Sequence, residues 1–155
     1  MREAWKVRGA LVLVVLGTLG VVWAGKPAAK VETLTGKAVR LADVLSKEGV
    51  KLDVEAAPHW LALVTDAGKV HPLVKDDGSR LFFNDETLLN RPMQITGRFL
   101  AGGSLLQVSV VNSLHKGKRY DVYYWCDICA IRRGAKNTCE CCGGPMVLKE
   151  EPVKE

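Results

Sequence analysis

The chain has 155 residues, of which 48% are hydrophobic and 25% are charged, and its formal net charge is +5. This length and composition are ordinary for one globular domain with a small appendage. Residues 26–155 carry 19 basic and 16 acidic side chains, an excess of only +3. Proteins that bind nucleic acid normally have a dense basic surface. We therefore expect no nucleic-acid partner.

Residues 9–25 form one uncharged hydrophobic run, GALVLVVLGTLGVVWAG. As an α-helix, this run spans about 26 Å, slightly less than the ~30 Å hydrocarbon core of a bilayer. Arg2, Lys6 and Arg8 precede the run, as expected when that end stays in the cytoplasm. The pattern predicts an N-terminal hydrophobic helix that contacts the membrane through residues 9–25, with the rest of the chain extracytoplasmic.

Two outcomes of export stay open. If the segment is retained, the protein is a single-pass protein of the cell membrane. Val22-Trp23-Ala24 also fits a signal-peptide cleavage site before Gly25, and cleavage would give a periplasmic or secreted protein. A buried core helix is disfavoured because the run is apolar on every face.

The chain after the membrane segment begins with a linker over residues 26–33, and residues 42–48 then predict one or two helical turns closed by Gly49. Asp85 is expected to cap a second short helix, which extends to Leu89. Five segments have the composition and alternation typical of β-strands: 35–41, 59–65, 69–74, 93–100 and 105–114.

Turn residues group four of these strands into hairpins. Asp66-Ala67-Gly68 separates the second strand from the third, and Ala101-Gly102-Gly103-Ser104 separates the fourth from the fifth. Pro72 lies within the third strand, which indicates an edge strand or a bulge. The order of a strand, a hairpin, a short helix and a second hairpin resembles the OB-fold, a small Greek-key barrel, over residues 34–113.

Residues 114–148 predict one further strand, 120–125, followed by a cysteine-rich metal knuckle. Residues 149–155 are mostly charged and are expected to be a frayed tail. The predicted fold class is therefore mainly β. It comprises a small OB-like Greek-key barrel and a C-terminal four-cysteine knuckle, preceded by one N-terminal hydrophobic helix.

All five cysteines lie between residues 126 and 142. Cys126 and Cys129 form one C-x-x-C turn, and Cys139 and Cys142 form a second after a gap of nine residues. Two such turns facing each other place four sulfurs in a tetrahedral cage for Zn²⁺, at Zn–S distances of about 2.3 Å. The sequence predicts a structural zinc site with these four ligands, and Cys141 as an alternative ligand or a free thiol.

The second turn, with Gly143-Gly144 after it, resembles the knuckles of zinc ribbons and rubredoxin-like proteins. The first turn is followed by Ala130, and the gap of nine residues is shorter than the usual 15–20 of a ribbon. Disulfides with thiol exchange are an alternative because an exported compartment is oxidising. An iron centre of rubredoxin type is a further alternative. Covalent haem is disfavoured because no histidine follows either C-x-x-C pair.

The sequence lacks the P-loop, H-E-x-x-H and G-x-S-x-G motifs, each of which marks a common enzyme class. His59, His71 and His115 are scattered, as surface or core histidines usually are. Strand alternation places Tyr123 and Trp125 on one face and Tyr124 on the other. These aromatic residues are expected to pack between barrel and knuckle, or to form a stacking platform for a ligand.

The hydrophobic start together with KDDGSRLFFND, NRPMQITGR, YYWCDIC and CECCGGPM resembles exported or membrane-anchored proteins of planctomycete-type bacteria. The resemblance implies localisation and architecture only. The expected function is a non-enzymatic, membrane-tethered or exported binding or scaffold module with a structural zinc site and an unknown protein or small-ligand partner. The alternative is an extracytoplasmic thiol-redox or electron-transfer protein that uses the cysteines.

Overall fold

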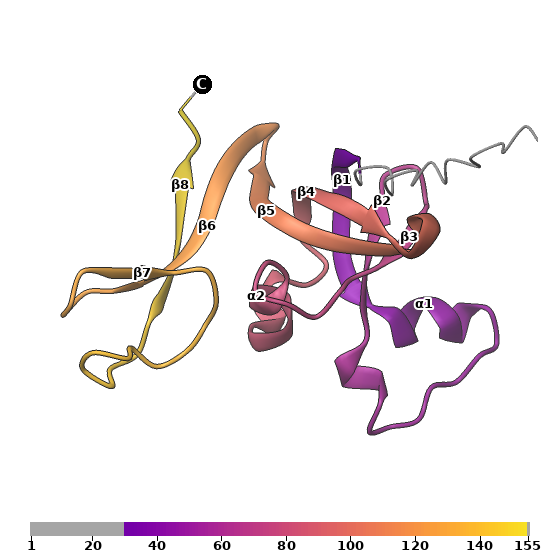
Figure 1. Ribbon diagram of the computed structural model, residues 1–155, viewed down its shortest axis with the longest axis horizontal. Helices are drawn as coiled ribbons and strands as arrows, with labels where there is room; N and C mark the ends of the chain where they lie inside the picture. The colour runs from indigo at the N-terminus through magenta and orange to yellow at the C-terminus, as the bar shows by residue number, and fades with distance from the viewer. Residues whose placement is uncertain (1–29, 155) are drawn as a thin grey trace, which may run out of the picture.

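The computed structural model describes residues 30–154, so the predicted signal or anchor over residues 1–25 lies outside the described residues. None of the helices within residues 30–154 has both the length and the apolarity to cross a bilayer. Strands are the most abundant regular structure in the described chain, which confirms the mainly β class. Figure 1 shows two parts that β6 joins.

The strands are β1 (Val31–Arg40), β2 (Leu61–Thr65), β3 (Val70–Pro72), β4 (Pro92–Leu100), β5 (Leu105–His115), β6 (Lys118–Cys126), β7 (Ile131–Arg133) and β8 (Val147–Pro152). The α-helices are α1 (Leu41–Lys47) and α2 (Arg80–Asn84). Short 3₁₀ turns are η1 (Ala57–His59), η2 (Glu86–Leu88) and η3 (Ala101–Gly103).

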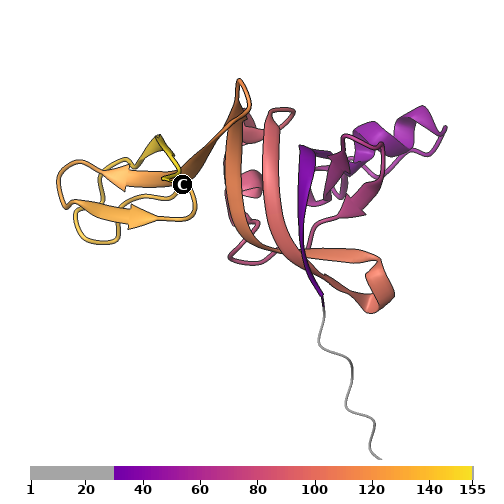
Figure 2. The same cartoon turned by 90° about the horizontal axis from the view of Figure 1, so that it is seen from above.

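The strands form one sheet in the order β3-β2-β1-β4-β5-β6-β7, and β8 pairs with β6 off this path. All of these pairs are antiparallel. An isolated parallel bridge joins Leu73, just after β3, to Leu106 of β5, and the Val74 amide donates to the Leu106 carbonyl at 3.0 Å. The sheet formed by the first five strands is therefore curved, so that the end of β3 reaches β5 at this bridge. Figure 2 shows this curvature from above.

Two glycines permit this close strand packing. A Cβ on Gly36 of β1 would lie 2.2 Å from the Val64 carbonyl oxygen, and one on Gly97 of β4 would lie 2.3 Å from that of Gln107. Real side chains do not tolerate such separations, so any larger residue would push the strands apart. The β4–β5 register also shifts between Thr96 and Gly97, and such a bulge increases local twist.

The predicted hairpins are confirmed, and β3 with Pro72 is an end strand of the sheet order. Asp85 also caps as predicted, because its carboxylate accepts the Thr87 amide at the start of η2. Among the predicted strands, the largest difference in a boundary is at the start of β1. β1 begins at Val31, within the predicted linker, because its first residues pair with β4 as far as Arg98. The apolar residues after Ser79 fold as α2, which buries Leu81 and Phe82.

The prediction of a frayed tail over residues 149–155 was wrong. Residues 147–152 form β8, which pairs along β6 from Trp125 to Tyr120. The charges at Lys149, Glu150 and Glu151 obscured the strand in the sequence. Glu150 forms an ion pair with Arg91, so partners elsewhere in the fold make a charged strand stable.

β6 has a different neighbour along each part of its length. Its first residues pair with β5, its last three pair with β7, and β8 follows its other edge. One hydrophobic core continues through both parts of the protein. It extends from Leu63, Phe82 and Ile95 to Tyr124 and Cys126. The segment with the cysteines, residues 126–152, is called the cysteine lobe below, and it is attached by a continuous strand and a shared core.

Candidate metal centre

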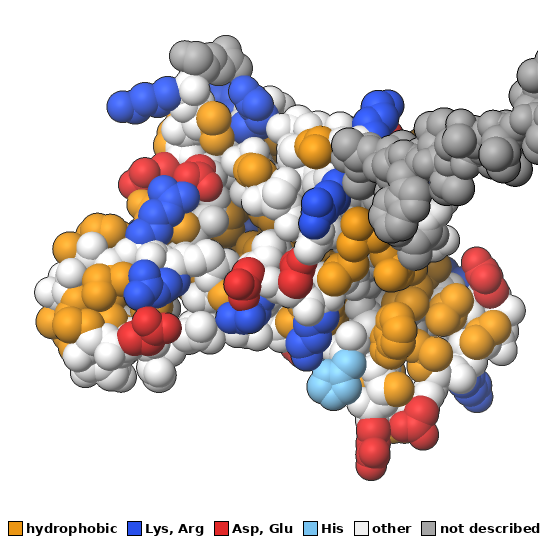
Figure 3. Space-filling model, viewed as in Figure 1, with side chains coloured by type: hydrophobic (Ala, Val, Ile, Leu, Met, Phe, Trp, Pro, Cys, Tyr) orange, Lys and Arg blue, Asp and Glu red, His pale blue; other side chains and the backbone are white. Residues whose placement is uncertain are grey.

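The four predicted ligands come together at the far end of β6. The Sγ atoms of Cys126, Cys129, Cys139 and Cys142 all lie within 4.8 Å of one another. Cys126 and Cys139 are 1% and 2% exposed, Cys129 is half-buried, and Cys142 is exposed. The group therefore has a buried side against the core and an open side toward solvent. Figure 3 shows orange side chains, the class that includes cysteine, on the surface of this lobe at the left.

Two turns of the same shape carry the ligands. The Ala130 amide donates to the Cys126 carbonyl at 2.9 Å, and the Gly143 amide donates to the Cys139 carbonyl at 2.7 Å. Ala130 and Gly143 have φ values of 53° and 69°, the left-handed region that glycine adopts most easily. The first turn thus has the geometry of the second although it lacks the glycine, and a short bridge between Thr138 and Pro145 closes the second.

Backbone amides surround the first sulfur of each turn. Amides of Cys142 and Cys141 donate to the Cys139 sulfur, and these bonds lower the pKa of that thiol to about 7. The Cys129 amide donates in the same way to Cys126. There, burial and the neighbouring thiols outweigh the amide, so the pKa of Cys126 is raised. The pKa of Cys129 is raised chiefly by the Cys141 thiol, then by Cys142. Four thiols this close cannot all ionise without a cation, because like charges repel.

The donor set and the spacing fit a tetrahedral metal ion. Four sulfurs at about 2.3 Å from a central Zn²⁺ are about 3.8 Å apart along the edges of the tetrahedron. The Cys126 and Cys142 Sγ atoms lie 3.6 Å apart, and the remaining pairs are within 4.8 Å. Thiolates prefer soft or borderline metals such as zinc or iron, so four of them disfavour Mg²⁺ and Ca²⁺.

Cys141 does not belong to this group of four. It lies in the second turn between Cys139 and Cys142, and its side chain is exposed. Of the two alternatives for Cys141 in the sequence, a free thiol therefore agrees better with the geometry than a ligand does.

A polar network joins the cysteine lobe to the rest of the fold. The Tyr124 hydroxyl on β6 donates to Asp85 at 2.8 Å, and the Lys136 ammonium lies 3.6 Å from the same carboxylate oxygen. Burial of Asp85 opposes its ionisation, but hydrogen bonds from Thr87 and Tyr124 outweigh this effect and lower its pKa. The Asn84 side chain adds a bond to the Lys136 carbonyl at 3.1 Å. The sequence marked Asp85 as a cap only, and no local pattern indicates its contact with Tyr124, 39 residues away.

A second contact lies on the other side of β6. Glu150 of β8 pairs with Arg91 and also with His115 of β5, whose Nε2 lies 2.9 Å from the carboxylate. Burial raises the pKa of Glu150, but Arg91 and then His115 outweigh it, so its pKa is lowered. The sequence indicated only a surface or core histidine at His115, whereas in the structure its ring contacts the Glu150 carboxylate.

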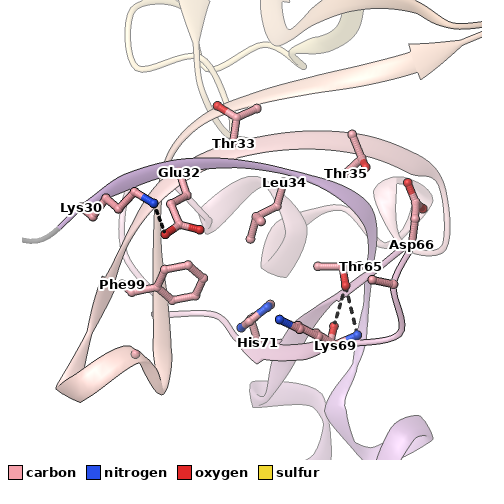
Figure 4. A pocket seen from close by; sticks show the side chains of 12 residues that line it. Lys30, Glu32, Thr33, Leu34, Thr35, Thr65, Asp66, Lys69, His71 and Phe99 are labelled. Atoms are coloured by element: carbon pink, nitrogen blue, oxygen red, sulfur yellow. Dashed lines mark hydrogen bonds and ion pairs between the residues drawn. The ribbon is translucent and has the colours of Figure 1, made fainter.

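A solvent-open cavity lies at one end of the first five strands, away from the cysteines. It has a volume of about 710 Å³. Figure 4 shows Leu34, Phe99 and His71 around it, with the rings of the last two 5.0 Å apart. Lys30 and Glu32 form an ion pair of 3.3 Å at its rim. The cavity is open to solvent and combines apolar walls with charges of both signs.

No family model, curated protein or solved structure matches the chain. The functions of the cysteine group and of the cavity are therefore inferred from their own geometry.

Proposed function

We propose that the protein is a non-enzymatic binding or scaffold module whose cysteine lobe is held by a structural zinc ion. The observation that carries this proposal is the group of four Sγ atoms within 4.8 Å, in two turns of matching geometry. Structural zinc sites are four-coordinate and closed by protein ligands. The four cysteines fill all four positions, which leaves none for a substrate or an activated water.

The size of the cysteine lobe supports a structural role for the metal. Its turns contribute few large apolar side chains to the core, and Ile128 between the first two cysteines is 77% exposed. Small lobes that bury little apolar surface depend on metals or disulfides for stability. A bound zinc would supply that free energy directly, because the site forms only in the folded chain.

The binding part of the proposal is an OB-like barrel of β1 to β5. Three features support it. β1 pairs with both β2 and β4, the end of β3 meets β5 in parallel, and α2 lies between β3 and β4. Barrel mouths are common sites for small ligands. The cavity beside Phe99 and His71 is the place in this barrel for a small ligand.

The tether in this proposal is the hydrophobic run at residues 9–25, which precedes β1 by only a few residues. With its basic flank in the cytoplasm, the run would hold the barrel and the cysteine lobe close to the outer surface of the cell membrane. Cleavage before Gly25 would release the same module as a periplasmic or secreted protein.

The direct test is the metal content of the purified full chain. We expect one zinc per chain, lost in Cys126→Ser, which removes the most buried ligand. Cys141→Ser is the matched control, because Cys141 lies outside the group of four, and it should retain one zinc. Metal-free protein with two disulfides would contradict the proposal. Bound iron would instead support electron transfer by the same four cysteines.

A further inference from the structure

The first residues of β1 have a strand partner on one edge only. β1 pairs with β4 over residues 31–37, but with β2 only over residues 36–40. The Asp66 amide then donates to the Thr35 carbonyl at 3.1 Å, and the chain turns away into the β2–β3 hairpin. Within residues 30–154, no strand therefore pairs with the β2-side edge of β1 over residues 31–33.

Alternate residues of β1 direct their backbone groups to this free edge. The Thr35 carbonyl bonds on the β2 side, whereas the Ala38 carbonyl accepts the Asn90 amide on the β4 side. Because successive residues of a strand direct their amide and carbonyl to opposite edges, Val31 and Thr33 face the same side as Thr35. Their amides and carbonyls make no hydrogen bond to another backbone group in the described part of the chain.

The cavity lies directly against this edge. Its lining includes residues 32–35 of β1, the β2–β3 hairpin and Phe99 of β4. Figure 4 shows the Leu34 side chain pointing from β1 into the cavity, where Phe99 and His71 lie. The volume of about 710 Å³ is within the range of roughly 300–1,000 Å³ that is usual for ligand sites. A free strand edge thus borders a space with apolar walls.

An extended peptide fits this combination better than a compact small molecule does. A strand edge presents amide and carbonyl pairs about 7 Å apart, two residues along the chain, and another extended backbone has the same repeat. In strand addition, main-chain hydrogen bonds supply affinity, and pockets for alternate side chains supply specificity. Here Val31 and Thr33 offer the hydrogen bonds, and the space beside Leu34 offers the pocket.

We propose that the cavity binds a short extended segment of another protein, apolar at alternate positions, as an added strand along residues 31–33 of β1. This proposal rests on the proposed function, since it names the class of ligand for the same cavity. The backbone of the segment bonds to Val31 and Thr33, and every second side chain enters the cavity beside Leu34 and Phe99. The zinc centre takes no part in it.

The edge is prepared for a strand before the partner arrives. Val31, Thr33 and Thr35 are β-branched residues, which favour the extended conformation, and their pairing with β4 already holds them in it. Such preorganisation lowers the entropy cost of binding. Lys30 and Glu32 form an ion pair at the rim. Charge is balanced there, so an uncharged segment fits better than a strongly acidic or basic one.

A second copy of this chain is a poorer occupant of the edge. An antiparallel pair of β1 edges that used Val31 and Thr33 of both copies would bond Val31 of one to Thr33 of the other. That register places the two Glu32 side chains directly opposite each other, and like charges in such positions destabilise a sheet. The partner is therefore a different polypeptide.

The test uses the isotope-labelled, purified full chain. The probe is a short peptide that alternates leucine and threonine and is capped at both ends. Amide hydrogen exchange is measured by NMR with and without the peptide. We expect saturating peptide to slow exchange of the Val31 and Thr33 amides by about tenfold or more. The Glu32 and Leu34 amides point to β4, so their exchange should change little.

Two methylated peptides show whether the backbone makes the contact. One is N-methylated at every threonine and the other at every leucine, so each loses the amide donors of one edge and keeps its side chains. Only one of these edges can face β1. One version should therefore bind about tenfold or more weaker than the parent peptide, and the other should bind equally well. Equal binding of both versions, or equal weakening, would overturn the proposal.

Thr33→Pro tests the same contact from the side of the protein. Proline removes the Thr33 amide, which faces away from β4, and edge strands tolerate proline at such positions. Thr33→Ala is the matched control, because both variants lose the hydroxyl that bonds to Thr96 but only the proline variant loses the amide. Calorimetric titration should show peptide binding about tenfold or more weaker in Thr33→Pro than in Thr33→Ala. Equal affinities would contradict strand addition.

The outcomes separate this proposal from the proposed function. No protection of the Val31 and Thr33 amides up to the solubility limit of the peptide overturns strand addition. Protection that rises with protein concentration in the absence of peptide also overturns it, because that result indicates a second copy at the edge. The zinc content of the same sample is measured separately. A chain without zinc contradicts the proposed function and leaves the exchange of these two amides as the test of the edge.

Discussion

The Tyr124 hydroxyl on β6 donates to the Asp85 carboxylate between α2 and η2, with the two oxygens 2.8 Å apart. Tyr124 is 1% exposed and Asp85 is 4% exposed. This bond joins β6, the strand that ends at Cys126, to the helical segment between β3 and β4. The same helical segment also contacts the cysteine lobe directly, through the Asn84 bond to the Lys136 carbonyl.

Tyr124→Phe is expected to lower the free energy of unfolding by about 1–3 kcal/mol, because it leaves a buried carboxylate without one of its donors. Tyr123→Phe is the control. The Tyr123 hydroxyl donates to Glu151 at 2.6 Å, but Glu151 is exposed to water, so the expected loss is much smaller than for Tyr124→Phe. Urea denaturation measures both. Equal losses would contradict the role given to the Tyr124–Asp85 bond.

The lowered pKa values of Asp85 and Glu150 predict the direction of the pH dependence. A carboxyl whose folded pKa is depressed stabilises the protein above its unfolded pKa, and this stability is lost as pH falls through the folded pKa. The reference values are 3.8 and 4.5. Stability should therefore be constant above them and should fall as the pH drops below them. Asp85→Asn should make the fall in the free energy of unfolding at low pH less steep. If this variant and the unaltered chain lose stability equally at low pH, Asp85 is not ionised in the folded protein.

Glu150→Gln tests how much the Glu150 contacts stabilise β8, the strand that forms where the sequence predicted a frayed tail. The Glu150 carboxylate pairs with Arg91 and His115, so its loss should lower the free energy of unfolding by about 1–3 kcal/mol. Glu140→Gln is the matched control. Glu140 pairs with Arg133 at 3.1 Å, and its side chain is 75% exposed, so the expected change is about 0.5 kcal/mol or less. Hydrogen exchange of β8 amides should rise in the first variant alone.

Ala130→Gly should stabilise the zinc-loaded protein by about 0.5–1 kcal/mol. Ala130 has a φ of 53°, a conformation that costs a residue with a Cβ about 1 kcal/mol more than glycine. Ala67→Gly in the β2–β3 turn is the control, because Ala67 does not have a positive φ. Its substitution should destabilise slightly through the entropy of the unfolded chain. A loss of stability in Ala130→Gly would mean that the first turn does not have the described geometry.

Local patterns in the sequence were sufficient for most of the strands. The hairpins around Gly68 and Gly102 follow from turn chemistry, and the cap at Asp85 follows from the preference of aspartate for that position. The four clustered cysteines follow from C-x-x-C spacing. Each of these features depends on residues close in sequence, which is why each was predictable.

Features that depend on distant partners were not predictable in this way. β8 carries Lys149, Glu150 and Glu151, and such a charged segment forms a strand only because β6 pairs with it and Arg91 neutralises Glu150. The turn geometry at Ala130 was hidden for a related reason. Alanine gives no local signal for a left-handed conformation, and the surrounding cysteine turn imposes it.

The central claim is a zinc ion held by four cysteine sulfurs, and X-ray absorption at the zinc edge of the purified full chain tests it most directly. We predict a first shell of four sulfurs at about 2.3 Å, unchanged in Cys141→Ser, and a first shell with oxygen or nitrogen in place of one sulfur in Cys142→Ser. A first shell dominated by oxygen or nitrogen in the unaltered chain, or no zinc at all, would contradict the account.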